Sequence, residues 1–155
     1  MHAEDKMRLA AMQDEHLQDI FGDSSNGTFR WFATQLVPNY LKVGQTCARV
    51  RLISTVRLNS HETKAQRAQN RMAMPRFQID VLDFSYERAR SAAKAIVDWL
   101  ALVDFSSDAQ FGSPVTSPNR HPNQVLNERD GMEPSTTPAA FVRTLDIRIL
   151  NLEEN

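Results

Sequence analysis

The sequence predicts an α+β fold, a two-layer sandwich in which two α-helices pack on one face of a mainly antiparallel β-sheet of about four strands. Three patterns predict this fold. Apolar and polar side chains alternate over residues 48–58 and 74–81 with the period of two that is typical of half-buried strands. The second segment runs directly into an amphipathic helix over residues 85–103, and residues 141–150 form another alternating segment. The 155 residues are expected to form a single domain, 1–155.

The helix predicted over residues 85–103 has a clear start. Ser85 stands at the N-cap position, and Glu87 in the first turn complements the helix dipole. Apolar residues then recur at helical spacing and define the face that should meet the sheet: Tyr86, Ala89, Ala93, Ile96, Val97 and Leu100.

The first third of the chain is also expected to contain a helix, over residues 2–21, which Gly22 ends. Residues 23–27 have the composition of a turn. Phe29 and Trp31 indicate a short extended segment within residues 28–37, and it should end before Pro38.

In the strand predicted over residues 48–58, apolar side chains occupy one face and arginines the other. Ser54 is the one exception on the apolar face. The predicted strands together place a polar set on the outer face of the sheet: Arg49, Arg51, Arg57, Arg76, Gln78, Asp80, Asp146 and Arg148. This face is expected either to be solvated or to meet a neighbouring subunit.

The remaining segments are polar. Residues 59–74 are expected to form an extended polar arm between two paired strands, with basic residues at Lys64, Arg67 and Arg71. Residues 104–122 are expected to be a surface loop, residues 123–129 a short edge strand and residues 131–138 a turn.

Composition excludes several classes of protein. The formal net charge of -1 gives no strong field toward nucleic acid or an acidic membrane. Cys47 is the only cysteine, so an internal disulfide is impossible. The first residues lack the apolar core of a signal peptide, and the most apolar run is too short to cross a bilayer. We therefore expect a protein made in a cytoplasm, without a membrane partner.

The search for chemistry finds no convincing site. No glycine-rich phosphate loop is present, and the four histidines fall in different segments. Cys47 is expected to be a small apolar residue at the start of a strand, and Asp80 to pair with an arginine on a neighbouring strand. We therefore expect no enzyme, no catalytic or metal-binding residue and no cofactor. The candidate interface residues are Arg49, Arg51, Arg57, Lys64, Arg67, Arg71, Arg76, Asp80 and Trp99. Their basic members have three possible roles: cross-strand pairing, contact with another subunit, or contact with DNA passing nearby.

Two stretches of the chain carry a resemblance. Residues 75–102 combine a Pro-Arg-x-Gln-Ile-Asp strand with an aromatic residue, a glutamate and an alanine-rich helix. Residues 127–134 form an acidic turn that ends in proline, and the strand over residues 141–149 follows it. This pattern resembles the tail-completion and tail-terminator proteins of long-tailed bacteriophages. The arm at 59–74 and the loop at 104–122 depart from the pattern of that family.

The resemblance implies a structural virion protein that is not an enzyme. Such proteins form rings, commonly hexamers, which cap the tail tube and join it to the head connector. The implied partners are further copies of the chain, the tail tube protein and a head-completion or connector protein, with DNA passing through the lumen without sequence recognition. The implied location is the tail or neck of the virion, and the host cytoplasm during assembly. Three alternatives stay open: a head-side completion protein, a small ligand-binding regulatory domain, and an enzyme with a dispersed site.

Overall fold

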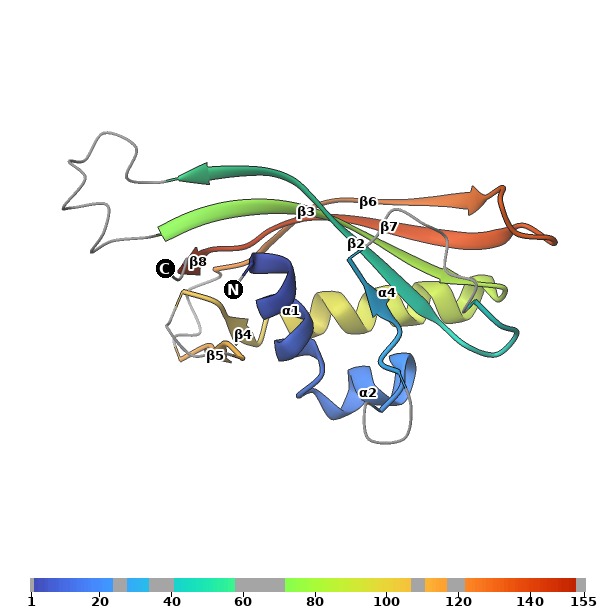
Figure 1. The fold of residues 1–155 in the computed structure, drawn as a ribbon, viewed down its shortest axis with the longest axis horizontal. Helices are drawn as coiled ribbons and strands as arrows, with labels where there is room; N and C mark the ends of the chain where they lie inside the picture. Colours follow the sequence, from blue (N-terminus) through green and yellow to red (C-terminus); the bar gives the residue numbers. More distant parts are fainter. Residues whose placement is uncertain are drawn as a thin grey trace.

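The computed structural model describes residues 2–23, 28–33, 41–57, 72–106, 111–116 and 122–152. Within these ranges the chain forms three α-helices: α1 (Ala3–Ala11), α2 (Glu15–Phe21) and α4 (Tyr86–Leu100). They accompany a six-stranded sheet (Figure 1). The α+β class is therefore as predicted, but the sheet has more strands than the expected four, and the helices number three rather than two.

The main sheet is a mixed one in which most neighbours are antiparallel. Its order is β1-β2-β3-β7-β6, and β8 also pairs with β3. Among the strand pairs of this sheet that the structure describes, β1 and β2 alone are parallel. The bounds are β1 (Trp31–Phe32), β2 (Cys47–Arg57), β3 (Met72–Asp83), β6 (Gln124–Glu133), β7 (Ala140–Arg148) and β8 (Asn151–Leu152).

Two predictions about loops are corrected. The segment expected to be only a surface loop contributes Asp104 to β4 (Val103–Asp104) and contains β5 (Ser113–Pro114), and the two strands form a small separate sheet. The edge strand β6 does not stop at residue 129 but continues through Glu133, so the predicted turn begins later. Both segments are polar and nearly all of β6 is exposed, which removes the alternation that marks a half-buried strand.

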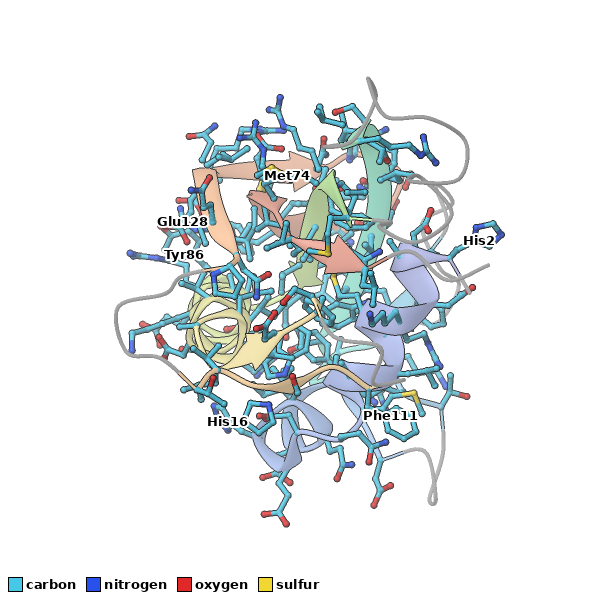
Figure 2. All side chains as sticks on the ribbon, turned by 90° about the vertical axis from the view of Figure 1, so that its left-hand side faces the viewer. His2, His16, Met74, Tyr86, Phe111 and Glu128 are labelled. Atoms are coloured by element: carbon cyan, nitrogen blue, oxygen red, sulfur yellow. The ribbon has the colours of Figure 1, made fainter. Side chains whose placement is uncertain are left out.

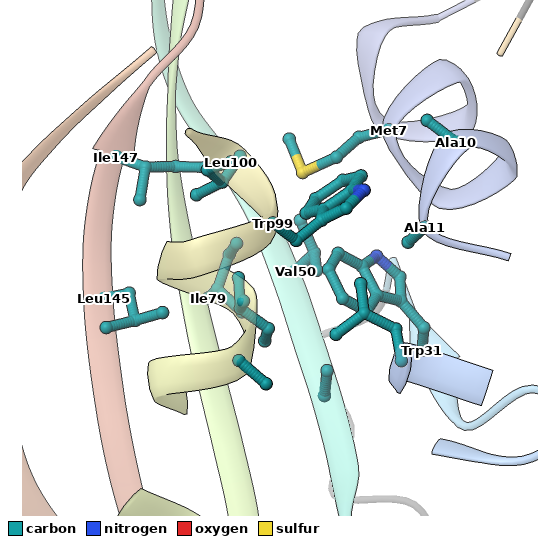
Figure 3. Packing of buried hydrophobic residues seen from close by; sticks show 14 of the residues in the cluster. Met7, Ala10, Ala11, Trp31, Val50, Ile79, Trp99, Leu100, Leu145 and Ile147 are labelled. Atoms are coloured by element: carbon teal, nitrogen blue, oxygen red, sulfur yellow. The ribbon is translucent and has the colours of Figure 1, made fainter. Parts of the chain in front are cut away.

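The helices lie on one side of the sheet, and the core lies between them (Figures 1 and 3). Ile79 and Leu145 from β3 and β7 are fully buried there, together with Ile96 of α4. Trp99 packs edge-to-face on Trp31, with ring centroids 6.1 Å apart, and so links α4 to β1. Hydrophobic burial of these side chains is what holds the helical layer on the sheet.

The predicted N-terminal helix is interrupted. α1 ends at Ala11, and α2 begins after Asp14, whose carboxylate accepts a hydrogen bond from the Leu17 backbone N–H at 3.0 Å. Asp14 is thus an N-cap in the middle of the expected helix. The buried Lys6 ammonium donates to the Phe105 carbonyl at 3.0 Å, which ties α1 to the residue that follows β4.

The α4 helix begins as predicted, with the Ser85 hydroxyl accepting from the Arg88 backbone N–H at 3.4 Å. Asp83, the last residue of β3, lies two residues before this N-cap and is fully buried. Its carboxylate accepts from the Thr46 hydroxyl at 2.6 Å and from the Arg88 guanidinium at 3.0 Å. Asp83 therefore joins the end of β3 to the start of both β2 and α4.

A β-bulge divides β2 into two halves. Leu52 pairs with Phe77 but Ser54 pairs with Arg76, so Ile53 is an extra residue. Beyond the bulge each side chain points to the opposite face from the one that simple alternation predicts. Arg57 pairs with the buried Ala73 and therefore lies on the helical side of the sheet. The prediction that Arg57 shares the outer face with Arg49 and Arg51 is wrong.

Candidate functional site: the outer face of the sheet

Asp80 is the centre of the polar outer face. Although it is only 6% exposed, it is well supplied with donors. The Arg49 guanidinium donates from Nη2 to Asp80 Oδ2 at 2.8 Å, and the Gln78 amide and the Thr144 hydroxyl donate to Oδ1 at 3.1 and 2.8 Å. These partners come from three adjacent strands, because the register places residues 49, 80 and 144 side by side. The predicted ion pair between Asp80 and a neighbouring arginine is confirmed.

Two opposing effects set the pKa of Asp80. Burial raises the pKa because it removes water from the charged form. Hydrogen bonds from Arg49, Gln78 and Thr144, together with the charge of Arg49, outweigh burial and hold the pKa below its usual range. Asp80 is therefore ionised near neutral pH, which suits a structural anchor and makes it a poor general acid.

A second carboxylate, Asp146, repeats the arrangement nearer the sheet edge. Arg129 of β6 donates to Asp146 Oδ2 at 2.9 Å, and an Arg76 guanidinium nitrogen lies 3.9 Å from the same oxygen. The Nε atom of Arg76 is buried and has no hydrogen-bond partner among the described residues. Further along, Glu133 Oε2 lies 3.3 Å from Arg49 Nη2 and accepts from it. Polar contacts thus cross β2, β3, β7 and β6.

The structure brings together four of the nine predicted interface residues. Arg49, Arg51, Arg76 and Asp80 share the outer face, where Arg51 donates to Gln78 at 2.9 Å. Trp99 is 6% exposed and belongs to the core, so its inclusion among the interface residues is corrected. Its place beside the apolar stripe of α4 was the signal for burial.

The remaining predicted interface residues do not join this group. Arg57 lies on the opposite face, as described above. Lys64, Arg67 and Arg71, and with them most of the predicted arm, lie outside the described residues.

Arg129, Glu133 and Thr144 belong to the outer-face network but were not among the predicted interface residues. Thr144 could have been found, because it alternates in phase with Asp146 in a predicted strand. Arg129 and Glu133 could not, because nothing in the polar sequence of β6 indicates its register.

The part of β2 beyond the bulge, which pairs with the start of β3, carries exposed apolar side chains; we call it the end of the β2–β3 hairpin. Beyond the bulge, β2 leaves Ile53 45% and Val56 59% exposed, and Leu52 just before them is 39% exposed. In Figure 1 the same ends of β2 and β3 extend past α1, and none of the three described helices covers them there. Val56 pairs with Met74 and lies on the outer face, whereas Leu52 pairs with Phe77 and lies on the helical face. Contiguous exposed apolar side chains mark contacts with other proteins, so Ile53 and Val56 are the candidates for such a contact.

A groove of about 710 Å³ lies between α4 and the strands β6 and β7. Its lining is rich in charge: Glu87, Arg90, Lys94, Asp98, Glu128 and Arg143. Arg143 is already engaged, because its guanidinium nitrogens lie 3.5 Å from Glu128 and 3.0 Å from Asp130. Small-molecule sites are mostly apolar with a small number of polar groups, whereas six of the ten residues that line this groove are charged.

Neither a nucleophile nor a metal site emerges from the described residues. Cys47 is fully buried, and burial is the main reason that its pKa is raised to about 11. Its thiolate is therefore scarce at neutral pH. Across the described ranges no three histidine, cysteine or acidic residues gather where they could hold a metal ion. None of the described helices has the length and apolar character needed to span a bilayer.

A comparison of the sequence with models of known protein families finds no match, and neither does a comparison with curated protein sequences.

Proposed function

We propose that this chain is a structural subunit of a phage tail, a tail terminator that forms a ring at the head-proximal end of the tail tube. The ring would cap the finished tube and offer a surface to the head connector. In this proposal the chain acts by binding, not by catalysis, and its partners are other copies of itself, the tube protein and a connector protein.

The observation that carries the proposal is the β2–β3 hairpin. Its end reaches beyond the helices with Ile53 and Val56 exposed, which costs solubility unless another protein covers them. The network around Asp80 supports the proposal, because it uses that carboxylate to hold β2, β3 and β7 in register instead of leaving it available for chemistry. The resemblance of residues 75–102, 127–134 and 141–149 to tail terminators supplies the identity of the partners, although residues 127–133 belong to β6 and not to the expected turn.

The experiment that tests the proposal mixes the purified chain with tail tubes assembled from the tube protein of the same phage. Negative-stain electron microscopy then counts the tube ends that carry a cap, and native mass spectrometry gives the mass of the chain alone. Caps at one end of most tubes would support the proposal. A chain that leaves tube ends bare, at concentrations well above that of the ends, would refute it.

The two closest alternatives predict different results. A head-side completion protein would bind connector rings and leave tubes bare. A ligand-binding regulatory domain would show a thermal shift with small molecules, and the charged groove at α4 is where they would bind. Six of the ten residues that line the groove are charged, which is more charge than a typical small-molecule site carries, so the tail proposal is preferred.

A further inference from the structure

The two broad surfaces of the molecule carry opposite charge. The outer face of the sheet holds five arginines (Arg49, Arg51, Arg76, Arg129 and Arg148) against three carboxylates (Asp80, Asp146 and Glu133), which leaves two surplus positive charges. Arg51 and Arg148 account for the surplus, because in the described part of the chain neither forms an ion pair.

The N-terminal helices carry the complementary charge. Residues 2–23 contain six carboxylates and only two lysine or arginine residues, Lys6 and Arg8. Both cations are directed inward: Lys6 donates to the Phe105 carbonyl, and Arg8 donates to the carbonyls of Trp31 and Phe29. Asp5, Glu15 and Asp19 are exposed, and within the described ranges they form no ion pair. We call residues 2–23 the acidic helical layer.

The two surfaces lie on different sides of one subunit. Figure 1 shows the helices on one side of the sheet, and Figure 2 shows nitrogen-tipped side chains gathered on the side of the sheet that faces away from them. The basic face cannot reach the acidic helical layer of its own chain. It can reach the same layer of a neighbouring copy.

We propose that the outer face of the sheet docks onto the acidic helical layer of a second copy of this chain. This inference rests on the proposed function only in its expectation of self-association, and it specifies which surfaces meet. The contact is heterologous, since each copy uses two different surfaces, and it closes into a ring when the rotation between copies permits.

The size of the surface fits this role. Four strands about 4.8 Å apart and roughly nine residues of 3.3 Å rise give a face of about 600 Å² before side chains are added. One partner of a standard protein interface buries about 800 Å². Complementary charge across such a face sets the orientation and speeds the encounter, and it makes the association sensitive to salt.

A charge-swap experiment tests the contact. The sheet variant carries Arg51→Glu and Arg148→Glu, and the helix variant carries Glu15→Lys and Asp19→Lys. Neither pair touches the carboxylates that hold the strands together, and residues 15 and 19 stay like-charged at i and i+4. The control variant, Arg90→Glu with Lys94→Glu on α4, changes the net charge as much as the sheet variant does but lies outside both surfaces.

The readout is native mass spectrometry over a concentration series at low and high salt. We expect the wild-type chain to form oligomers that weaken at high salt, and each swapped variant alone to associate at least tenfold more weakly. Mixing the two variants should restore oligomers that contain both. The helix variant's unchanged sheet face then meets the sheet variant's unchanged helices, and the sheet variant's acidic face meets the helix variant's basic helices, so both contacts are complementary. The control variant should associate like the wild type.

Three results would overturn the inference: a wild-type chain that stays monomeric at the highest concentration, a swapped variant that associates normally, or a mixture that does not recover. Circular dichroism checks that the variants fold, and the single substitutions Arg51→Glu and Asp19→Lys replace any double variant that does not. Binding of DNA by the sheet face in place of a second copy would appear as normal self-association of the sheet variant with lost DNA retention. Tube capping is scored separately, so a chain that self-associates through these surfaces and ignores tubes would refute only the tail proposal.

Discussion

The central residues on the two faces of the sheet reach similar burial by different means. On the helical side Phe77, Ile79 and Leu145 are buried by packing against apolar neighbours. On the outer side Asp80, Thr144 and Asp146 are almost as buried, yet each is polar and depends on directional partners. Packing tolerates many apolar side chains of suitable volume, whereas a buried carboxylate tolerates only a neighbour that can donate.

This difference predicts how each face should respond to change. Substitutions on the inner face should lower the free energy of unfolding in proportion to the side-chain volume removed, at any pH. Substitutions on the outer face should lower it less, by an amount that depends on pH and on which hydrogen-bond partner is removed. The exposed end of the β2–β3 hairpin depends neither on core packing nor on the polar network. Substitutions there should leave the free energy of unfolding almost unchanged.

The largest effect is expected for Phe77→Ala. Phe77 is fully buried between the sheet and the helices, and its removal leaves a cavity that the core cannot refill. We expect the free energy of unfolding to fall by about 3–5 kcal/mol. Urea denaturation followed by circular dichroism measures it. The matched control is Val56→Ala on the exposed hairpin end, which should change stability by less than about 0.5 kcal/mol. Equal losses for both variants would show that the inner face is not the dominant source of stability.

A smaller, pH-dependent effect is expected for Asp80→Asn. The change removes the carboxylate that neutralises Arg49, although Arg49 keeps Glu133 as a second partner. We therefore expect the free energy of unfolding to fall by about 2 kcal/mol at pH 7. The folded pKa of Asp80 lies below its unfolded value of about 3.9. Its ionised form therefore stabilises the fold above that value, and the contribution is lost as pH falls through the folded pKa.

Urea denaturation between pH 7 and pH 3 measures the consequence. The gap in stability between wild type and Asp80→Asn should be widest at neutral pH and should narrow below about pH 4. The control is Asp98→Asn, whose side chain is 64% exposed in an i,i+4 pair with Lys94 and which should cost less than about 0.5 kcal/mol. A gap that stays constant down to pH 3 would contradict the assigned role of Asp80.

Thr144→Val tests a single hydrogen bond of the same network. Its hydroxyl donates to Asp80 Oδ1 at 2.8 Å, and valine has the same shape without the donor. We expect the free energy of unfolding to fall by about 1 kcal/mol. Thr144→Ser keeps the hydroxyl donor and should therefore retain most of that stability. In a double-mutant cycle with Asp80→Asn the two losses should be non-additive, and strict additivity would mean that the two side chains are not coupled.

Periodicity predicted the parts of the fold where one side is buried and the other is not. The inner and outer faces of β2 up to Leu52, the β3 strand and the start of α4 at Ser85 follow from alternation and capping alone. The break at Asp14 had a signal, since aspartate followed by glutamate is typical of a helix start. This signal was missed because apolar residues before and after Asp14 continue the helical spacing, which favoured a single helix.

The bulge explains the largest error at the candidate site. One extra residue at Ile53 moves Arg57 from the outer face to the helical face. Ser54 was the visible sign, because it stood at an apolar position in the unbroken pattern. The extent of β6 had no comparable sign. An exposed edge strand pairs through its backbone, so its side chains need not alternate, and charged residues there also discourage unwanted pairing.

The smallest effect on folding, and the clearest on assembly, is expected for Ile53→Ser combined with Val56→Ser. Both side chains are about half exposed and contribute little to the core, so thermal unfolding should shift by no more than about 2 °C for a change under 0.5 kcal/mol. If the hairpin end is covered by a neighbour in the proposed ring, the loss of both apolar side chains should sharply lower the fraction of capped tubes. Leu102→Ser is the matched control, because Leu102 is 66% exposed just after α4 and outside the hairpin. Capping at the wild-type level by the hairpin variant would show that the exposed end of β2 is not a contact surface, and it would remove the main structural support for a tail terminator.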